Sequence, residues 1–496
     1  EVSELKRVNK RLENKVSSRD KKIEKLDGEL YRANLKIKQL ESELKALKAD
    51  NEKLKIQSEK DYTNSSFPSS SSVFPRKVKN SREKTDRKPG GQIGHEGHKR
   101  KQYETDEYVF IPAEEKILND EKRYVELDEY TSRKLIDIRV DVRVIEYRSK
   151  LYRDMYNGKI IHADFPEGLD NEINYSANIK ALAYYLNNYC NVSIDKTIDF
   201  ISQISDHRVI LSKGFVSNLG RQFHQRALDQ NKEMFSLLSK ADILYTDNTN
   251  ARVNGKSAFV YVTTDKDKVM FNMSLHKGHQ GVSNTPVYNS LGTIVHDHDL
   301  TFYNYGKNHQ ECLAHILRYL QSSIDYEKDI SWAADMKQLL QQIIHEVKKA
   351  PLDEKQIKEK KKRYEQIIRT GLKEYIKHPP NDYYMDGFNL LMRMKEYEAA
   401  TLYFLDHPQV DYTNNISESL CRKVKRKIRA VTTFRSNEHL SYYCDGLSII
   451  ETARCANQNI YSVITDIFNR PKCKEDVKLS QKESDIPENN CEGCEQ

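Results

Sequence analysis

Acidic side chains stand in three unlike settings of the sequence that could together bind divalent cations. Asp247 ends the β-type run ILYTD, Asp297 ends the run GTIVHD, and Glu418 opens a helical run rich in Lys and Arg. Carboxylates at the ends of neighbouring strands, joined by one from a packed helix, can share two divalent cations. Two such ions support the cutting and joining of a phosphodiester. The sequence therefore predicts a nucleic-acid-processing enzyme.

A second aspartate competes for one of these positions. Asp299 lies two residues after Asp297, and the period-two alternation of a strand would put both side chains on one face. Asp297 directly ends the apolar run TIV, so we favour it. We also take His298, His315 and Arg318 as auxiliary candidates for the active site.

A possible zinc set lies in the segment HQECLAHILRYLQ, for which the pattern predicts a helix. His309, Cys312 and His315 would fall on successive turns of one face of that helix. Their spacing would suit zinc, but no fourth ligand is evident in the sequence. We therefore favour a role in packing or substrate contact for these three side chains.

Positive charge is concentrated in two stretches, both suited to a phosphate backbone. Residues 76–101 hold ten Lys and Arg against three acidic residues, and residues 422–429 hold six with no acidic residue. A solubilising tether is the alternative for the first stretch. The candidate DNA contacts are Arg76, Lys77, Lys79, Arg87, Lys88, Lys99, Arg100, Lys101, Arg422, Lys423, Lys425, Arg426 and Lys427.

A heptad repeat covers residues 1–56. Val, Ile or Leu fills most a positions, Leu fills most d positions, and Asn9 and Asn51 occupy a positions where polar residues fix register. The facing g and e charges are complementary in six pairs, Glu1/Lys6, Lys15/Asp20, Lys22/Asp27, Lys36/Glu41, Glu43/Lys48 and Asp50/Lys55. This pattern predicts a parallel two-stranded coiled coil and hence a homodimer, with a solvated single helix as the alternative.

The rest of the chain divides by composition. A Ser/Pro-rich linker covers 61–75, and alternating apolar residues over 103–165 predict a small β-containing module. Residues 193–224 resemble a helix-turn-helix whose recognition helix would start near Ser212, although ordinary helix packing fits equally well. Three strands follow from 241, with Asn254 and Gly255 at a hairpin turn, and GTIVHD forms a fourth.

The chain of 496 residues is long enough for two to four domains with real cores. No apolar run reaches the roughly 20 residues of a membrane span, and the first residues do not resemble a signal peptide. The eight cysteines lack the spacing of a disulfide-rich domain. Cys491 and Cys494 together supply only two of the four ligands of a zinc site. We therefore expect a cytoplasmic, nucleoid-associated protein without a membrane partner.

These motifs together resemble the transposases of bacterial insertion-sequence family sixty-six, the TnpC type. The matching segments run in family order from about 60 to 465, and the N-terminal coiled coil also belongs to the pattern. They are NSSFPSSSS, RKPGGQIGHEGH, TDNTNARVNGK, GTIVHDH, HQECLAHILRYL, VDYTNNISE with its basic helix, FRS and IIETARCANQNIYSVI. The family usually has Glu where Asn248 stands, has cysteines around 105–165 where this chain has none, and has a glycine pair before FRS.

The resemblance implies an α/β multidomain protein with a ribonuclease-H-like catalytic domain that carries a helical insertion. It implies an Asp-Asp-Glu triad at Asp247, Asp297 and Glu418, two Mg²⁺ or Mn²⁺ ions, and auxiliary positions at Asn414 and Asn415. The implied reaction is cleavage at the element's terminal inverted repeats, followed by attack of the freed 3′-hydroxyl on target DNA. Accessory proteins of the same element are the usual partners.

The predicted domains follow from these patterns and the resemblance. They are a coiled coil (1–57), a linker and basic stretch (58–102), a β-containing module lacking zinc ligands (103–170), a helical region (171–240), the catalytic domain (241–430) with its insertion (326–400), a C-terminal helical region (431–470) and a disordered tail (471–496). A catalytically decayed DNA-binding regulator and a ribonuclease-H-fold nuclease are the alternative functions.

Overall fold

The computed structural model describes residues 2–61, 64–65, 103–120, 122–381 and 383–471. Its described part divides into two compact units. The first comprises the N-terminal segment together with residues 175–194 and 214–471, and the second comprises residues 103–174 and 195–213. The basic stretch 76–101 and the Cys491–Cys494 pair lie outside the residues that the structure describes.

A five-stranded mixed sheet lies in the first unit. Its strands are β3 (Ile243–Val253), β4 (Lys256–Thr264), β5 (Val269–Ser274), β6 (Thr293–His296) and β7 (Asn308–Glu311), in the order β5-β4-β3-β6-β7. The first three are antiparallel, whereas β6 is parallel to β3 and β7 is parallel to β6. Asn254 and Gly255 connect β3 to β4 with φ of 48° and 75°, the left-handed conformation that an Asn-Gly hairpin turn requires.

The strand boundaries correct two expectations from the sequence. Asp247 does not end its strand, because β3 continues to Val253 and pairs with β4 as far as Val253↔Lys256. His309 lies on strand β7 and not on a helix, because α7 begins only at Leu313. Strand β7 reads Asn-His-Gln-Glu and has no apolar residue, so its sequence gave no strand signal. It pairs with β6 all the same, over four residues.

Two helices pack against the sheet and complete its core. They are α12 (Asn415–Val431), which contacts β3 and β4, and α13 (Asn437–Cys455), which contacts β5. Apolar side chains of the strands, such as Val262 and Phe271, share one buried cluster with Leu420, Val424 and Leu447 of these helices. This cluster determines which face of α12 is buried and therefore which of its charged residues remain accessible.

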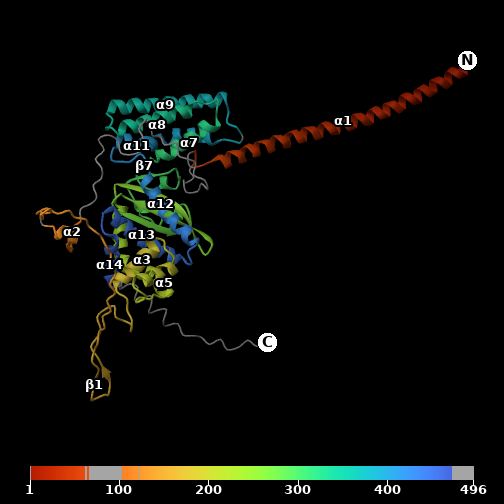
Figure 1. Cartoon of the computed structure of the whole chain (residues 1–496). Helices are drawn as coiled ribbons and strands as arrows, with labels where there is room; N and C mark the ends of the chain where they lie inside the picture. Colours follow the sequence, from red (N-terminus) through yellow and green to blue (C-terminus); the bar gives the residue numbers. More distant parts are fainter. Residues whose placement is uncertain (1, 62–63, 66–102, 121, 382, 472–496) are drawn as a thin grey trace, which may run out of the picture. The chain divides into compact units, whose positions relative to one another are not determined.

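A helical cluster follows β7 directly. It contains α7 (Leu313–Tyr326), α8 (Trp332–Val347), α9 (Glu354–Lys377), α10 (Asp386–Glu396) and α11 (Glu398–Asp406), labelled in part in Figure 1. Trp332 is fully buried in its core, and a reciprocal capping box between Asp353 and Gln356 starts α9. Helix α7 therefore joins the end of the sheet to this cluster.

Further helices complete the first unit. They are α3 (Ala177–Tyr184), a π-helical turn (Tyr185–Tyr189), α5 (Lys213–Ser239) and α14 (Ile460–Asn469). Tyr184 stacks on Phe223 with ring centroids 4.5 Å apart, and Phe468 packs edge-on to both rings. Helix α4 (Ile194–Ile204) and α5 have the break between them that the sequence predicts, but α4 belongs mostly to the second unit. The helix-turn-helix therefore stays a prediction.

The second unit has little regular structure among its described residues. Besides α4 it contains the short helix α2 (Glu115–Leu118) and an antiparallel pair of two-residue strands, β1 (Tyr152–Arg153) and β2 (Ile160–Ile161). Within the β-containing module predicted over 103–165, residues 125–151 form no strand, and β1 with β2 supplies its described pairing. Most apolar side chains of residues 125–151, Ile138 among them, are exposed. Alternation specifies one face of a strand, but a strand forms only with a partner to pair with.

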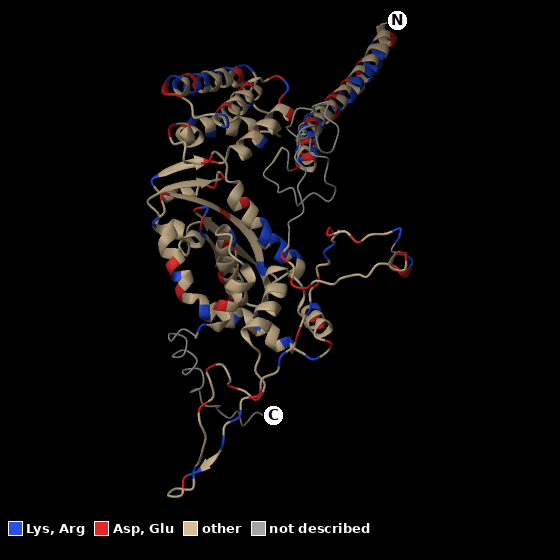
Figure 2. Cartoon of the chain, turned by 60° about the vertical axis from the view of Figure 1, so that its left-hand side comes forward, with Lys and Arg blue, Asp and Glu red and all other residues tan. Residues whose placement is uncertain are grey.

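Helix α1 (Val2–Glu59) is one continuous helix of 58 residues. Its apolar a and d side chains face solvent, with Leu12 53% and Leu40 49% exposed, and Ile56 alone is buried. Charged residues of both signs follow one another along its length (Figure 2). The described residues contain no helix long and apolar enough to cross a membrane.

Candidate active site

Two of the three predicted acids come from neighbouring strands, Asp247 on β3 and Asp297 directly after β6. Strands β3 and β6 are parallel with Tyr245 opposite Val295, and two residues further along each chain stand Asp247 and Asp297. Parallel pairing keeps a constant offset, so the two carboxylates emerge at the same edge. Both line a pocket of about 560 Å³.

Burial and like charge destabilise the ionised form of this pair. Burial raises the pKa of Asp247 to about 8, the charges of Asp297 and Glu418 add to the rise, and the Asn248 N–H opposes it. Burial likewise raises the pKa of Asp297 to about 6, with a further contribution from Asp299. The Asp297 Oδ1 atom is buried and has no hydrogen-bond partner among the described residues.

The third acid reaches this pocket because Asn414 fixes the start of α12. The buried Asn414 side chain donates from Nδ2 to the carbonyl of Thr246, 2.7 Å away, one residue before Asp247. Its backbone N–H donates to Cys312 Sγ at 3.2 Å. Glu418 then lies one helical turn after Asn414 and lines the same pocket as both aspartates. Asn415, the first residue of the helix, is exposed.

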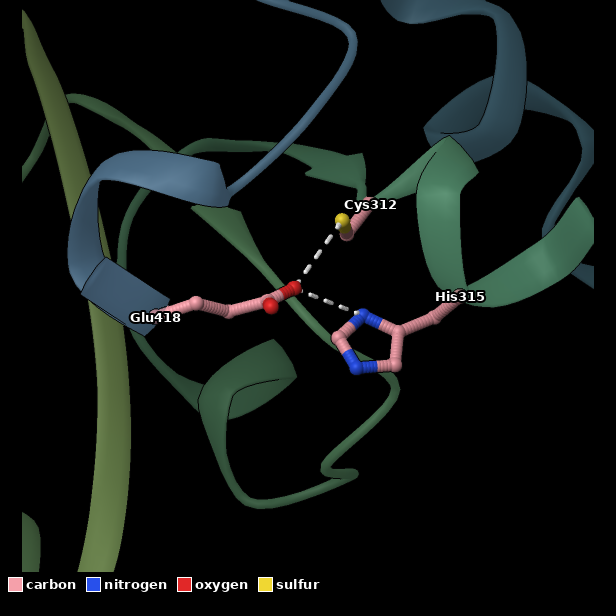
Figure 3. Close-up of side chains that lie close together, drawn as sticks. All are labelled: Cys312, His315 and Glu418. Carbon is pink, nitrogen blue, oxygen red and sulfur yellow. Dashed lines mark hydrogen bonds and ion pairs between the residues drawn. The ribbon is translucent and has the colours of Figure 1, made fainter. Parts of the chain in front are cut away.

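Several side chains surround the Glu418 carboxylate. His315 Nδ1 is 3.5 Å and Arg318 Nη2 is 3.6 Å from its Oε1 atom. Cys312 Sγ lies 4.0 Å from the same oxygen, and Arg422 Nη2 lies 3.7 Å from Oε2. Figure 3 shows Cys312 and His315 at the start of α7 pointing toward Glu418 on α12. Burial lowers the pKa of His315 to about 3, and the charge of Arg318 contributes, so the ring is neutral at pH 7.

The donor set of the pocket fits divalent cations. Three carboxylates converge there, two of them with raised pKa values and one with an unpartnered buried oxygen. Hard cations such as Mg²⁺ prefer oxygen ligands and would relieve the repulsion between these groups.

One family model matches the part of the chain that contains this pocket. The family model described as "Transposase IS66 family" matches residues 174–441, more than half of the chain and the whole of the pocket. The chain belongs to the IS66 transposase family. No curated protein matches it. The resemblance inferred from the motifs is thereby confirmed, and membership implies a DNA-cleaving enzyme of a kind that generally uses divalent metals.

The basic residues 422–429 of this IS66-family transposase are predicted to contact DNA phosphates, and we call them the phosphate clamp. Only some of them are accessible for that role. Arg422 and Lys425 line the pocket, and Arg426 is exposed. Lys427, in contrast, is 6% exposed and donates to the carbonyl of Asn187 at 2.7 Å. Burial lowers the pKa of Lys427 to about 8. We therefore withdraw Lys427 from the DNA-contact set, because helical periodicity turns it toward the core that α12 forms with the sheet.

Lys423 is also engaged within the transposase, in an ion pair with the buried carboxylate of Glu451 on α13. A cation that sequence reasoning missed, Lys277, lines the pocket and pairs with Asp299 at 3.5 Å. Asp299 also accepts the Thr301 N–H at 3.0 Å. Its carboxylate is thus partnered, whereas the Asp297 Oδ1 atom is not.

A buried polar network, centred on Glu311 at the end of β7, supports the loop after Asp297. His298 Nδ1 lies 2.5 Å from Glu311 Oε1, and the Tyr303 hydroxyl donates to the same oxygen. Arg393 of α10 donates to Oε2 from Nη2 at 2.7 Å and from Nε at 3.2 Å. Burial alone would raise the pKa of Glu311, but the His298 hydrogen bond and the Arg393 charge lower it to about 2.

Sequence reasoning missed Glu311 and Arg393, because neither belongs to a motif with the spacing of metal ligands or catalytic residues. The shared helical face expected for His309, Cys312 and His315 is also wrong, because His309 does not lie on a helix. His309 is on β7, and its Nδ1 atom lies 3.2 Å from Nε2 of His296, away from Cys312 and His315.

Proposed function

We propose that this chain is an active DNA transposase in which Asp247, Asp297 and Glu418 bind two Mg²⁺ or Mn²⁺ ions. The observation that carries the proposal is the pair of half-buried aspartates, Asp247 on β3 and Asp297 directly after β6, which line one pocket with a third carboxylate. When bound, two such ions would activate water or a 3′-hydroxyl and stabilise the leaving oxygen. The three carboxylates would fix their positions.

The sheet order supports a ribonuclease-H-like catalytic domain. Its central strand β3 has an antiparallel meander on one side and two parallel strands on the other. Asp247 stands on the central strand, and Asp297 directly follows its parallel neighbour β6. In this interpretation helices α8 to α10 are an insertion between the second aspartate and the glutamate.

The cations around the pocket support a DNA substrate. Lys277, Arg422 and Lys425 line it, and the exposed Arg426 stands one residue further along α12. Lys and Arg in such positions neutralise phosphates and release counterions. In this proposal they hold the DNA backbone beside the three carboxylates, and the basic stretch 76–101, outside the described residues, adds further phosphate contacts.

The charge on α12 leads to a prediction about salt dependence. Arg422→Gln, Lys425→Gln and Arg426→Gln are each expected to weaken DNA binding and to reduce the slope of log K against log salt by about 1. Fluorescence anisotropy with labelled duplex DNA at several salt concentrations measures that slope. Lys427→Met is the matched control on the same helix, and its slope is expected to equal that of the wild type because Lys427 is buried. Equal slopes for all four variants would refute the clamp.

The exposed apolar stripe of α1 supports a homodimer through a parallel coiled coil. Deleting residues 2–57 is expected to lower the molar mass in light scattering from dimer to monomer. Leu12→Asp with Leu40→Asp should do the same in the full chain, because charge at d positions disrupts the seam. Asn14→Asp, at an f position that faces away from the seam, should change the mass little. An unchanged mass after the deletion would remove the coil from the proposal.

Strand transfer tests the function itself. Purified chain, DNA carrying the element's end sequences and Mg²⁺ should yield joined product on a target plasmid. DNA binding with no cleavage would favour a catalytically decayed regulator, and cleavage with no joining would favour a nuclease. Accessory proteins of the element, added in parallel, show whether joining requires them.

A further inference from the structure

Three side chains beside the proposed catalytic pair form a second group of potential metal ligands. Cys312 Sγ, His315 Nδ1 and a carboxylate oxygen of Glu418 all lie within 4.8 Å of one another. Sγ is 4.0 Å and Nδ1 is 3.5 Å from Glu418 Oε1 (Figure 3). Cys312 is the residue just before α7, His315 lies in the first turn of α7, and Glu418 comes from α12.

The chemistry of this set differs from that of the carboxylate pocket. Thiolate and imidazole are ligands of Zn²⁺, whereas Mg²⁺ takes oxygen ligands almost exclusively. Around a tetrahedral Zn²⁺ with bonds of about 2.0–2.3 Å, ligand atoms lie roughly 3.5 Å apart. The separations from Glu418 Oε1, 3.5 and 4.0 Å, are close to that value before any metal has drawn the ligands together.

The His315 ring supplies an independent observation. His315 is only 8% exposed, and its Nδ1 atom has no hydrogen-bond partner among the described residues even though it points at Glu418. A buried nitrogen without a partner is costly unless something binds it. Burial raises the pKa of the Cys312 thiol to about 11, and the Asn414 N–H that donates to Sγ at 3.2 Å opposes that rise.

A fourth position is available from the pocket. His315 and Glu418 both line the pocket of about 560 Å³, so a water molecule can complete a tetrahedral site with three protein ligands. One contact opposes binding. Arg318 Nη2 is 3.6 Å from Glu418 Oε1 and must move away from that oxygen for a cation to take its place. The site therefore suits a reversibly bound cation better than a permanent structural one.

We propose that Cys312, His315 and Glu418 form a Zn²⁺ site and that its occupation inhibits the transposase. On binding, a Zn–S bond replaces the S–H bond of Cys312, the proton passes to solvent, and no group is oxidised or reduced. Glu418 Oε1 is then a zinc ligand and is withdrawn from the ions held by Asp247 and Asp297. The zinc binding does not depend on the proposed function, whereas the inhibition rests on the proposed catalytic role of Glu418.

Cobalt absorption tests the binding directly. Co²⁺ is titrated into the full chain carrying Cys491→Ser and Cys494→Ser, which removes the Cys-x-x-Cys pair as a competing site. A thiolate-to-Co²⁺ charge-transfer band is expected and should disappear on addition of Zn²⁺. Cys312→Ser should abolish the band, and His315→Gln should weaken cobalt binding at least about tenfold. Cys455→Ser, which removes an exposed thiol elsewhere, and Asp247→Asn should both retain it. A band that survives Cys312→Ser refutes the site.

Zinc inhibition of strand transfer tests the consequence. With Mg²⁺ in excess, each variant is compared with its own activity without Zn²⁺. The Cys312→Ser variant should require at least about ten times more Zn²⁺ for half inhibition than the wild type. Equal inhibition of both chains would overturn the inhibitory role even where the cobalt band supports binding. A wild type that joins no DNA would refute the proposed function, and the cobalt experiment would still decide the zinc site.

Discussion

Asp297→Asn is expected to abolish both cleavage and strand transfer, by at least about a thousandfold, or about 4 kcal/mol of transition-state stabilisation. The physical reason is that Asp297 offers a buried, unpartnered Oδ1 atom beside Asp247. Asparagine keeps the shape of the side chain but loses the negative charge that a divalent cation needs. A gel assay of nicked and joined DNA in Mg²⁺ measures the loss.

Asp299→Asn is the matched control, two residues away and lining the same pocket. Its carboxylate pairs with Lys277 at 3.5 Å and accepts the Thr301 N–H, so it is already partnered. We expect this variant to keep activity within about tenfold of the wild type. A larger loss in Asp299→Asn than in Asp297→Asn would show that the sequence argument chose the wrong aspartate.

A stability measurement separates lost chemistry from lost folding. Without divalent cations, Asp297→Asn should unfold at the same temperature as the wild type or higher, because it removes repulsion from Asp247. Mg²⁺ should raise the unfolding temperature of the wild type and not that of the variant, since only the wild type binds it tightly. An inactive variant that unfolds at a lower temperature without cations would not support the triad.

Arg393→Met is expected to lower the free energy of unfolding by about 3–5 kcal/mol, because it leaves the buried carboxylate of Glu311 without its cation. Glu311 is buried and Arg393 is half-buried, with side-chain exposures of 1% and 14%. The pair joins α10 to the end of β7. Trp332, the single tryptophan and fully buried in the helical cluster, reports unfolding by its fluorescence in a urea titration.

Arg369→Met is the matched control for this measurement. Arg369 pairs with Glu365 at 2.9 Å on the exposed face of α9, where an ion pair contributes about 0.3–0.5 kcal/mol. The double variant Glu311→Gln with Arg393→Met should recover part of the lost stability, since no unpaired charge remains buried. If Arg393→Met costs no more than Arg369→Met, the network does not hold the β7 end in place.

The helical cluster and the proposed catalytic pocket are coupled through this network. Glu311 also accepts from His298, which lines the pocket one residue after Asp297. Loss of Arg393 should therefore reduce strand transfer as well as stability, even though Arg393 itself does not line that pocket. This gives the segment between the second aspartate and the glutamate a positioning role beyond its own packing.

Local patterns in the sequence were enough to predict the β3–β4–β5 meander and the three acids that meet in the pocket. Asn254 and Gly255 favour a tight hairpin turn by backbone sterics alone, and apolar runs mark the strands that enter the core. The same logic fails for β7, because its buried residues Gln310 and Glu311 are polar and have partners far away in the chain. Residue types and spacing also identified the family.

Only the tertiary structure decided how these parts meet. The bond from Asn414 to the Thr246 carbonyl places Glu418 beside Asp247 across more than 160 residues of chain, a pairing that no periodicity encodes. From the sequence alone, Lys427 and Arg426 were both predicted to contact DNA. Packing of α12 on the sheet buries Lys427 and leaves Arg426 exposed. Cys312 and His315 meet Glu418 for the same reason. Spacing along one element follows from local geometry, whereas contacts between distant elements follow from which buried groups can satisfy one another.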